Sequence, residues 1–174
     1  ENNENNENNE NNENNENNIE ILKLKKEEYN LLANIIDKSK KLFNCFIYPE
    51  ISNILNLIDT NNIFVFYKKE NKNILSVYFF RETSTSYNKK KCIECFCTIN
   101  INESKQNFIN NFYYILKILS ERYEFILIEQ ISHNVDIIEN IISNNVLEFV
   151  SPTAYYFYNY FVPTKRSRDV LIIN

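Results

Sequence analysis

The absence of glycine constrains this 174-residue sequence more than any other feature. Average usage of about 7% would give roughly 12 glycines in a chain of this length. Loops that cradle phosphate groups need glycine, because only a residue without a Cβ lets the backbone approach a phosphate closely and take positive φ freely. The sequence therefore excludes Rossmann dinucleotide, P-loop nucleotide and kinase-type sites. Another domain would have to hold any phosphorylated cofactor.

A repeated segment opens the chain, since residues 1–18 are six copies of Glu-Asn-Asn. A tract without apolar residues cannot offset the entropy of ordering, so we expect a disordered low-complexity linker. Six of the chain's 23 acidic residues lie in this tract, which leaves 17 beside 19 basic residues. The nearly neutral remainder, residues 19–174, is long enough for one domain with its own core. Because the chain begins at Glu1 and contains no Met, we expect a fragment of a longer protein with an upstream domain.

Apolar periodicity predicts alternating strands and helices after the repeat. Predicted strands cover residues 19–24, 89–99, 125–131, 146–150, 153–162 and 169–174, and a hairpin covers 63–80. Predicted helices cover residues 27–43, 49–59, 104–123 and 134–145, with Ser104 as the N-cap of the longest. We expect the strand at 125–131 to be buried and parallel to the strand before the long helix, because a helix connects them. This order predicts an α+β fold in which helices flank a mixed sheet.

The order of elements is similar to the GNAT acyltransferase superfamily. Four stretches resemble, more specifically, the C-terminal half of glycylpeptide N-tetradecanoyltransferase, the N-myristoyltransferase family. They are ILSVYFFRETS (74–84), FILIEQISHN (125–134), YYFYNYFVP (155–163) and KRSRDVLIIN (165–174). The resemblance spans residues 19–174 in order and spacing, and the Tyr-Asn strand is its distinctive part. It implies a divergent member with a GNAT-like fold.

The resemblance also implies a function, the transfer of myristate from myristoyl-CoA to the N-terminal glycine of proteins. In this family the N-terminal half holds myristoyl-CoA, so this domain would bind no cofactor itself, would pack on that missing half and would form much of the peptide groove. The catalytic base would be the terminal carboxylate of Asn174. Substrate contacts would come from Tyr78, Thr83, Thr153 and Ile173.

Several positions depart from the family pattern. The Gly-Asp-Gly turn of the family falls on Val150, Ser151 and Pro152, without the acid that contacts the peptide. Its Leu-Pro-Ser/Thr turn falls on residues 80–83, and a groove Tyr falls within residues 95–97. A degenerate, non-catalytic scaffold or protein-interaction domain is therefore the alternative function.

The cysteines and the single histidine offer weaker candidates for chemistry. Strand alternation places Cys95 and Cys97 on one face and Cys92 on the other, far in sequence from Cys45. We expect buried reduced thiols, no metal site and a cytoplasmic location. His133 lies in a predicted loop, where a solvated residue is expected more than a general base.

The basic and aromatic runs have ordinary structural interpretations. The lysines near residues 89–91 and the basic residues at 165–168 are interpreted as solvated edges, so nucleic acid is not an expected partner. The aromatic run at 155–160 fits core and groove-wall positions better than a stacking platform. No apolar run reaches the roughly 18 residues that cross a bilayer, which predicts no transmembrane segment. The Asn excess indicates a compositional bias, so single Asn residues are given little weight.

Overall fold

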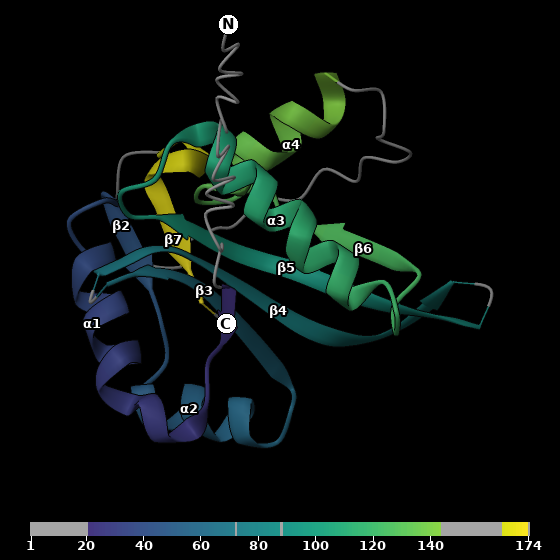
Figure 1. Cartoon of the computed structure of the whole chain (residues 1–174), viewed down its shortest axis with the longest axis horizontal. Helices are drawn as coiled ribbons and strands as arrows, with labels where there is room; N and C mark the ends of the chain where they lie inside the picture. The colour runs from purple at the N-terminus through teal and green to yellow at the C-terminus, as the bar shows by residue number, and fades with distance from the viewer. Residues whose placement is uncertain (1–20, 72, 88, 144–164, 174) are drawn as a thin grey trace, which may run out of the picture.

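The computed structural model describes residues 21–71, 73–87, 89–143 and 165–173 (Figure 1). Its strands are β1 (Ile21–Lys23), β2 (Cys45–Ile47), β3 (Ile63–Glu70), β4 (Asn73–Tyr87), β5 (Lys90–Asn100), β6 (Phe125–Ile128) and β7 (Val170–Ile172). Its α-helices are α1 (Tyr29–Ser39), α2 (Ile51–Asp59), α3 (Lys105–Leu119) and α4 (Asn134–Ser143). Short 3-10 turns, η1 (Lys26–Glu28) and η2 (Ser167–Asp169), precede α1 and β7. The predicted linker and the predicted strands at 146–150 and 153–162 lie outside the described residues.

Within the described residues, five strands form a sheet in the order β1-β3-β4-β5-β6. The predicted hairpin is confirmed, because β3 and β4 pair antiparallel, as do β4 and β5. The predicted crossover is also confirmed, because β5 and β6 pair in parallel and α3 connects them. Strand β2 was not predicted; it pairs in parallel with β7 in a separate two-stranded sheet. Three residues are too few for alternation to register in the sequence.

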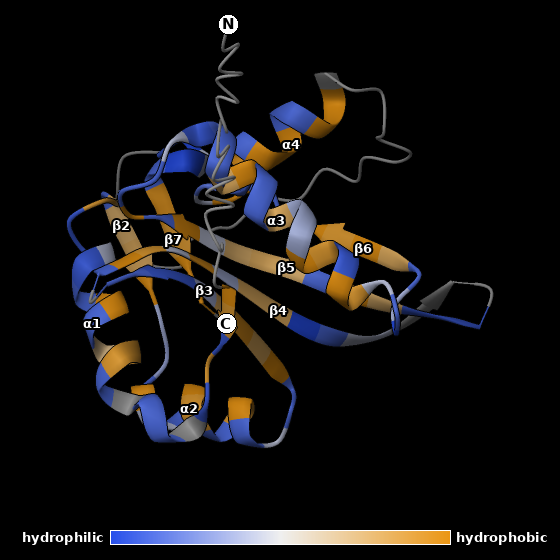
Figure 2. Cartoon of the chain, in the orientation of Figure 1, coloured by the Kyte–Doolittle hydropathy of each residue, from blue (hydrophilic) through white to orange (hydrophobic). Residues whose placement is uncertain are grey.

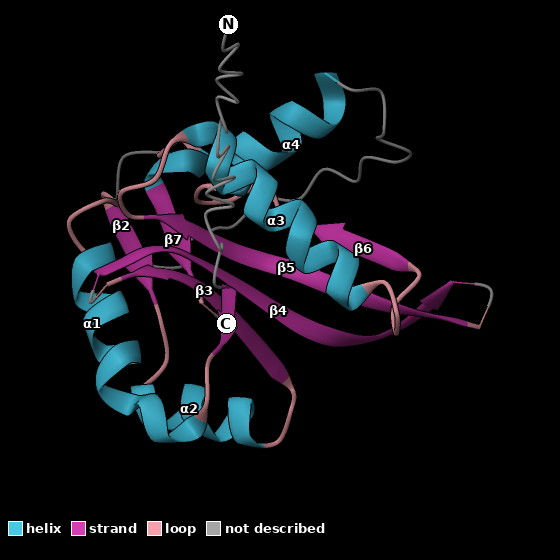
Figure 3. Ribbon diagram, in the orientation of Figure 1, coloured by secondary structure: helices cyan, strands magenta, loops and turns pink. Residues whose placement is uncertain are grey.

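The sheet separates two layers of helices (Figures 1 and 3). Helices α1 and α2 lie on one face together with β2 and β7, and α3 and α4 lie on the other. Each face has its own apolar cluster, and in Figure 2 the apolar positions of the helices gather toward the sheet. The predicted α+β architecture with a mixed, helix-flanked sheet is therefore confirmed.

Other side chains perform the tasks that glycine usually serves in turns. Among the described residues, Asn61, Asn71, Lys89 and Ser132 take positive φ, between 52° and 66°. Asn tolerates the left-handed region because its short amide bonds locally, whereas Lys and Ser reach it less readily. Asn61 follows α2, and Asn71 lies in the turn of the β3–β4 hairpin. The glycine-free sequence can therefore form tight hairpins.

Two predictions about the sheet are wrong. Strand β6 is not fully buried, because Phe125 and Leu127 are 38% and 46% exposed at the edge of the described sheet. Cys95 and Cys97 do not share a face, because Cys97 pairs opposite Phe79 while Cys95 pairs opposite Phe80. Two residue steps on β5 thus match one step on β4, which is a β-bulge. The bulge moves Cys97 to the face of α1 and α2 and leaves Cys95 on the face of α3.

Candidate functional site

Open sheets usually bind ligands beyond the carboxyl ends of parallel strands, and here β5 and β6 form the parallel pair of the five-stranded sheet. Backbone pairing between them ends at Cys95 and Ile128, although β5 continues to Asn100. The loop at residues 129–133 follows β6 and turns back against the unpaired part of β5. Its backbone donates from Glu129 N to Cys95 O and from His133 N to Thr98 O. The chain's own loop therefore fills the space where the two strands separate.

Side chains of the same loop complete this closure. The Ser132 hydroxyl donates to Thr98 O at 3.0 Å, and Ser132 itself is buried at a φ of 52°. The Asn134 amide donates to Cys95 O at 3.1 Å and to Glu129 O at 2.8 Å. A serine in the left-handed region is retained only when surrounding contacts fix it. These bonds occupy backbone groups of β5 that an extended ligand would otherwise use.

His133 is packed in the structure and is not the solvated residue that the sequence predicted. Its Nδ1 accepts a hydrogen bond from Asn100 N at 2.7 Å, so this nitrogen carries no proton. The ring lies 4.9 Å from Phe43 and 6.5 Å, edge to face, from Phe108. Burial lowers the pKa of His133, and Arg168 lowers it further against the opposing effect of Asp136. The imidazole thus connects both faces of the sheet in its neutral form, and its Nδ1 is not free to act as a base.

Cys95 and Cys97 are unsuited to nucleophilic chemistry. All four are free thiols, and Cys92, Cys95 and Cys97 are buried. Burial raises the pKa of Cys97 to about 12 and that of Cys95 well above its usual value. Thiolate is the nucleophilic form, so both side chains stay inert near neutral pH. Among the described residues, no group of three or more His, Cys, Asp or Glu side chains is arranged to bind a metal ion.

The two basic clusters are engaged by acidic side chains. Lys90 pairs with Glu124, and Lys91 lies 3.6 Å from Glu82. At the other cluster, Arg168 donates to Asp136 at 2.8 Å. Asp136 also forms a salt bridge with Lys105, with 2.9 Å between Oδ1 and Nζ, and this pair connects the start of α3 to α4. Arg166 pairs with Asp169 in the same segment at 2.9 Å. These contacts offset part of the positive charge of both clusters, and the bond from Arg168 to Asp136 holds the C-terminal segment against α4.

The residues predicted to bind substrate are spread over the fold. Tyr78 is buried under α3, where its hydroxyl donates to Phe108 O at 2.8 Å, so a peptide could reach it only if α3 moved. Thr83 lies on β4, half-buried and near Cys92. Ile173 is 1% exposed within the cluster under α1 and α2. Thr153 and Asn174 lie outside the described residues. The described structure therefore does not bring Tyr78, Thr83 and Ile173 together, and their substrate roles remain predictions.

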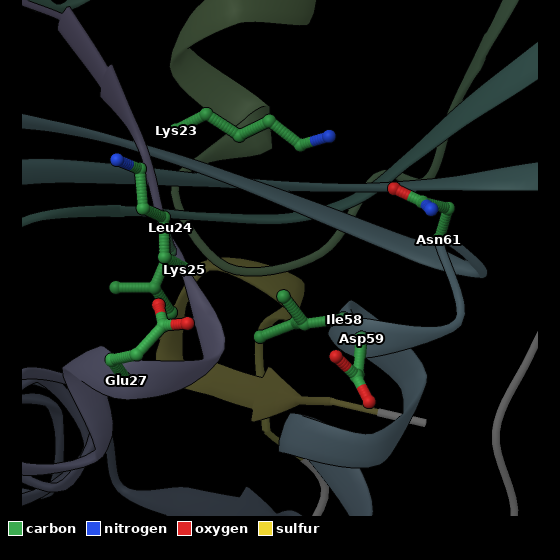
Figure 4. Close-up of a pocket in the computed structure, with 7 residues that line it drawn as sticks. All are labelled: Lys23, Leu24, Lys25, Glu27, Ile58, Asp59 and Asn61. Carbon is green, nitrogen blue, oxygen red and sulfur yellow. The ribbon is translucent and has the colours of Figure 1, made fainter.

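An open pocket lies between the start of the domain and the end of α2 (Figure 4). It has a volume of about 280 Å³ and is lined by Lys23, Leu24, Lys25, Glu27, Ile58, Asp59 and Asn61. Leu24 and Ile58 form its apolar part, and both belong to the core cluster that contains Ile173. The pocket thus combines an apolar base with charges of both signs.

Neither the residues of this pocket nor the polar residues under α3 were predicted from the sequence. Asn111 lies on the buried face of α3, three residues after Phe108 and four before Ile115. A polar residue at an apolar position of the helix indicates a buried hydrogen-bonding role. The excess of Asn in the chain hid this indication, because single Asn residues were given little weight. Glu27 and Asp59 gave no such signal, because each lies in a segment rich in polar residues.

Comparison with known proteins identifies the fold. No family model matches the sequence, and no curated protein matches it. An aminoglycoside acetyltransferase from an uncultured soil metagenomic sample, in complex with sisomicin, matches with a TM-score of 0.58 at 13% identity, over 83% of this chain and 97% of that one. A second soil metagenomic aminoglycoside acetyltransferase matches with a TM-score of 0.60 at 11% identity, over 82% and 99%. The ribosomal-protein-alanine N-acetyltransferase of Brucella melitensis matches with a TM-score of 0.59 at 8% identity, over 80% and 99%.

These likenesses establish a GNAT-like fold, as predicted. They cover nearly the whole length of each neighbour. Identities this low carry information about the fold alone. Separately, no helix in the described parts of the chain is long and apolar enough to span a membrane.

Proposed function

We propose that this domain is the amine-binding half of an acyltransferase, in which the terminal carboxylate of Asn174 accepts a proton from the substrate amine. The GNAT-like fold supports acyl transfer in general, because the named neighbours are an aminoglycoside acetyltransferase and a ribosomal-protein-alanine N-acetyltransferase. The resemblance to N-myristoyltransferases supports the finer proposal of an N-terminal glycine as acceptor and myristoyl-CoA as donor.

The observation that carries the proposal is the burial of Ile173, which directly follows the C-terminal strand β7. Ile173 lies in the same cluster as Leu24 and Ile58, which form the apolar part of the pocket. Its backbone N donates to Ile47 O at 2.9 Å, so the strand is held up to the residue before Asn174. The terminal carboxylate of Asn174 would therefore be attached directly to a buried residue whose backbone is fixed. This is the support that a positioned base needs.

The pocket offers carboxylates that could receive an amine. Glu27 and Asp59 line it, together with Lys23 and Lys25, and the two carboxylates would attract an ammonium group. An N-terminal amine with a pKa of about 7.7–8.0 must lose its proton before it can attack a thioester. In the proposed reaction the Asn174 carboxylate takes that proton. The free amine then attacks the thioester carbonyl, the new C–N bond forms as the C–S bond breaks, and the remaining amine proton leaves with the CoA thiol.

Two features support placing the acyl-CoA site outside this domain. The loop at residues 129–133 fills the separation between β5 and β6, and the chain has no glycine to cradle a pyrophosphate. An N-terminal half would hold myristoyl-CoA and present its thioester to the pocket.

Binding tests the amine site. A peptide with a free N-terminal glycine is titrated into isotope-labelled protein, and the N-acetylated peptide is the matched control. The proposal predicts amide shift changes around Leu24 and Ile58 with the free peptide, weaker binding of the acetylated one, and loss of this preference in Asp59→Asn. Shift changes confined to other surfaces would refute the amine site.

A non-catalytic scaffold is the second candidate, and the closure of the β5–β6 separation favours it. The four described cysteines are free and three of them are buried, and the described histidine uses Nδ1 on a backbone N–H. A scaffold would bind a partner without distinguishing a free amine from an acetylated one. The two peptides therefore separate the candidates.

A further inference from the structure

The C-terminal segment, residues 165–173, lies beside the five-stranded sheet and is not part of it. Among the described residues, its strand β7 pairs only with the three-residue strand β2. Near the two ends of this pairing, Asn44 N donates to Asp169 O and Ile173 N donates to Ile47 O, each at 2.9 Å. A short two-stranded ribbon is only marginally stable by itself. Contacts outside the ribbon therefore contribute to holding the segment.

Two such contacts join the segment to the chain around His133. Ser132 N, in the loop at residues 129–133, donates to Ser167 O at 2.9 Å. The Arg168 guanidinium donates to both oxygens of the Asp136 carboxylate on α4, at 2.8 and 3.3 Å. Ser132 directly precedes His133, and Asp136 follows it by three residues. A movement of His133 would therefore disturb both contacts.

The His133 ring is also packed against the chain that leads into β2. Phe43 lies 4.9 Å from it, ring to ring, and is followed by Asn44, which bonds to the C-terminal segment. On its other side the ring accepts a hydrogen bond at Nδ1 from Asn100 N at 2.7 Å. The imidazole thus contacts both parts of the chain that hold the segment, the loop at 129–133 and the approach to β2.

Protonation of His133 would remove the bond to Asn100. In the neutral ring, Nδ1 provides the lone pair that accepts from the Asn100 N–H. A proton can bind only at that nitrogen, because the other ring nitrogen already carries one. Two donors would then face each other across 2.7 Å. The protonated ring therefore cannot keep its position beside Asn100.

The charged groups around the ring have opposing effects. Asp136 of α4 favours the charged ring, and Arg168 of the C-terminal segment disfavours it. Lys105 of α3 lies 2.9 Å from the same carboxylate and adds positive charge there. The two aromatic rings packed on the imidazole carry no charge, and β5 presents a backbone N–H. An imidazolium would compete with Arg168 for Asp136, which would weaken the attachment of the segment.

We propose that His133 is an acid-sensitive switch that controls how firmly the C-terminal segment is held. With a neutral ring, the loop at 129–133 and Asp136 hold residues 165–173 against the domain. With a protonated ring, the loop loses its bond to Asn100 and the segment opens more often, while the five-stranded sheet stays folded. This inference stands whether or not Asn174 acts as a base.

The proton affinity of the ring sets the size of the effect. When the segment is open, His133 has an ordinary pKa of about 6.5, whereas burial lowers its pKa when the segment is closed. Opening therefore takes up a proton between these two values, and each pH unit in that interval increases opening by up to about tenfold. We expect opening to increase at least about threefold from pH 7 to pH 5 and to be constant above about pH 7.5.

The chain contains a single histidine, so its titration can be followed directly in the wild-type protein. The ring proton shifts and the backbone amide shifts are recorded by NMR from pH 8 to pH 4.5. The proposal predicts that the amide shifts of Ser132, Ser167 and Ile173 change with the same midpoint as the ring, below pH 6.5. A ring that titrates while the Ser167 and Ile173 amides stay unchanged would overturn the proposal. This test needs no variant.

Hydrogen exchange measures opening of the segment. Ser132 N and Ile173 N report on the segment, and Leu24 N, which donates to Val65 O at 2.7 Å, reports on the five-stranded sheet. Rates are corrected for the intrinsic pH dependence of exchange. We expect Ser132 and Ile173 to be less protected than Leu24, and their protection to fall at least about threefold from pH 7 to pH 5. Equal protection of all three amides would contradict a segment that opens separately.

His133→Gln is the matched control for the exchange measurement. Its side-chain oxygen can still accept from Asn100 N, but it does not titrate in this range. The protection of Ser132 and Ile173 in this variant should be independent of pH between 7 and 5. An equal fall in wild type and His133→Gln would refute the role of His133.

Discussion

Replacing His133 with Leu tests whether the loop at 129–133 is a fixed part of the fold. The change leaves the Asn100 N–H without its acceptor, which costs about 1–3 kcal/mol when the donor is buried. Asn100 is only half-buried, so the lower part of that range applies. Loss of the ring contact with Phe43, at 4.9 Å, adds about 0.5–1.5 kcal/mol. The sum is a destabilisation of about 2 kcal/mol.

Urea unfolding at pH 7.5, followed by circular dichroism, measures this loss. His133→Gln is the matched control, because its side-chain oxygen can still accept from Asn100 N and only the ring is lost. We expect Gln to cost less than Leu. A loss below about 0.5 kcal/mol in His133→Leu, comparable to an ordinary surface change, would refute the argument that His133 holds the loop closed.

The same histidine sets a pH dependence. Its pKa is lowered in the folded protein, by burial first, with Arg168 adding to the effect and Asp136 opposing it. The unfolded chain therefore binds the proton first as the pH falls below about 6.5. The stability contributed by neutral His133 is complete above that pH and is lost as the pH falls through the lowered folded-state value. Wild type should lose more stability than His133→Gln between pH 7 and pH 5, and parallel curves would contradict the assignment.

Three further substitutions test local arguments by urea unfolding. Ser104→Ala removes the cap bond from Asn107 N and should cost about 1 kcal/mol, whereas a neutral result would remove Ser104 from the capping role. Asp136→Asn weakens the bond from Arg168 and should cost about 1–2 kcal/mol at pH 7, since the cationic partners are partly exposed; added salt should reduce the difference. Lys89→Gly relieves a φ of 66° and should stabilise the protein by about 0.5–1 kcal/mol, so a destabilised variant would contradict the argument from backbone strain.

Local patterns explain the predictions that are confirmed. The hairpin of β3 and β4 follows from two apolar runs around a polar turn, and the Ser104 cap follows from its place before an amphipathic run. The parallel pairing of β6 follows from the intervening helix. Each signal lies within a few residues of the element that it specifies.

The predictions that are wrong depend on distant parts of the chain. The bulge at Phe96 follows from how β5 pairs with β4, and strict alternation along β5 cannot reveal it. His133 is packed because Phe43 and Phe108, from opposite faces of the sheet, reach the same loop. The apolar sequence of β6 does not indicate that it lies at the edge of the described sheet. Tertiary contacts decide these features.

The most direct test of the central claim is a transfer assay on the longest natural form of the protein ending at Asn174. Myristoyl-CoA and an N-terminal glycine peptide are the substrates. The native protein is compared with a semisynthetic form in which only the terminal carboxylate of Asn174 is replaced by an amide, which preserves shape and removes the base. We predict transfer by the native protein and a loss of at least about 100-fold in the amide form, the usual size of a general-base contribution. Equal transfer by both forms, or none by folded native protein, would contradict the account.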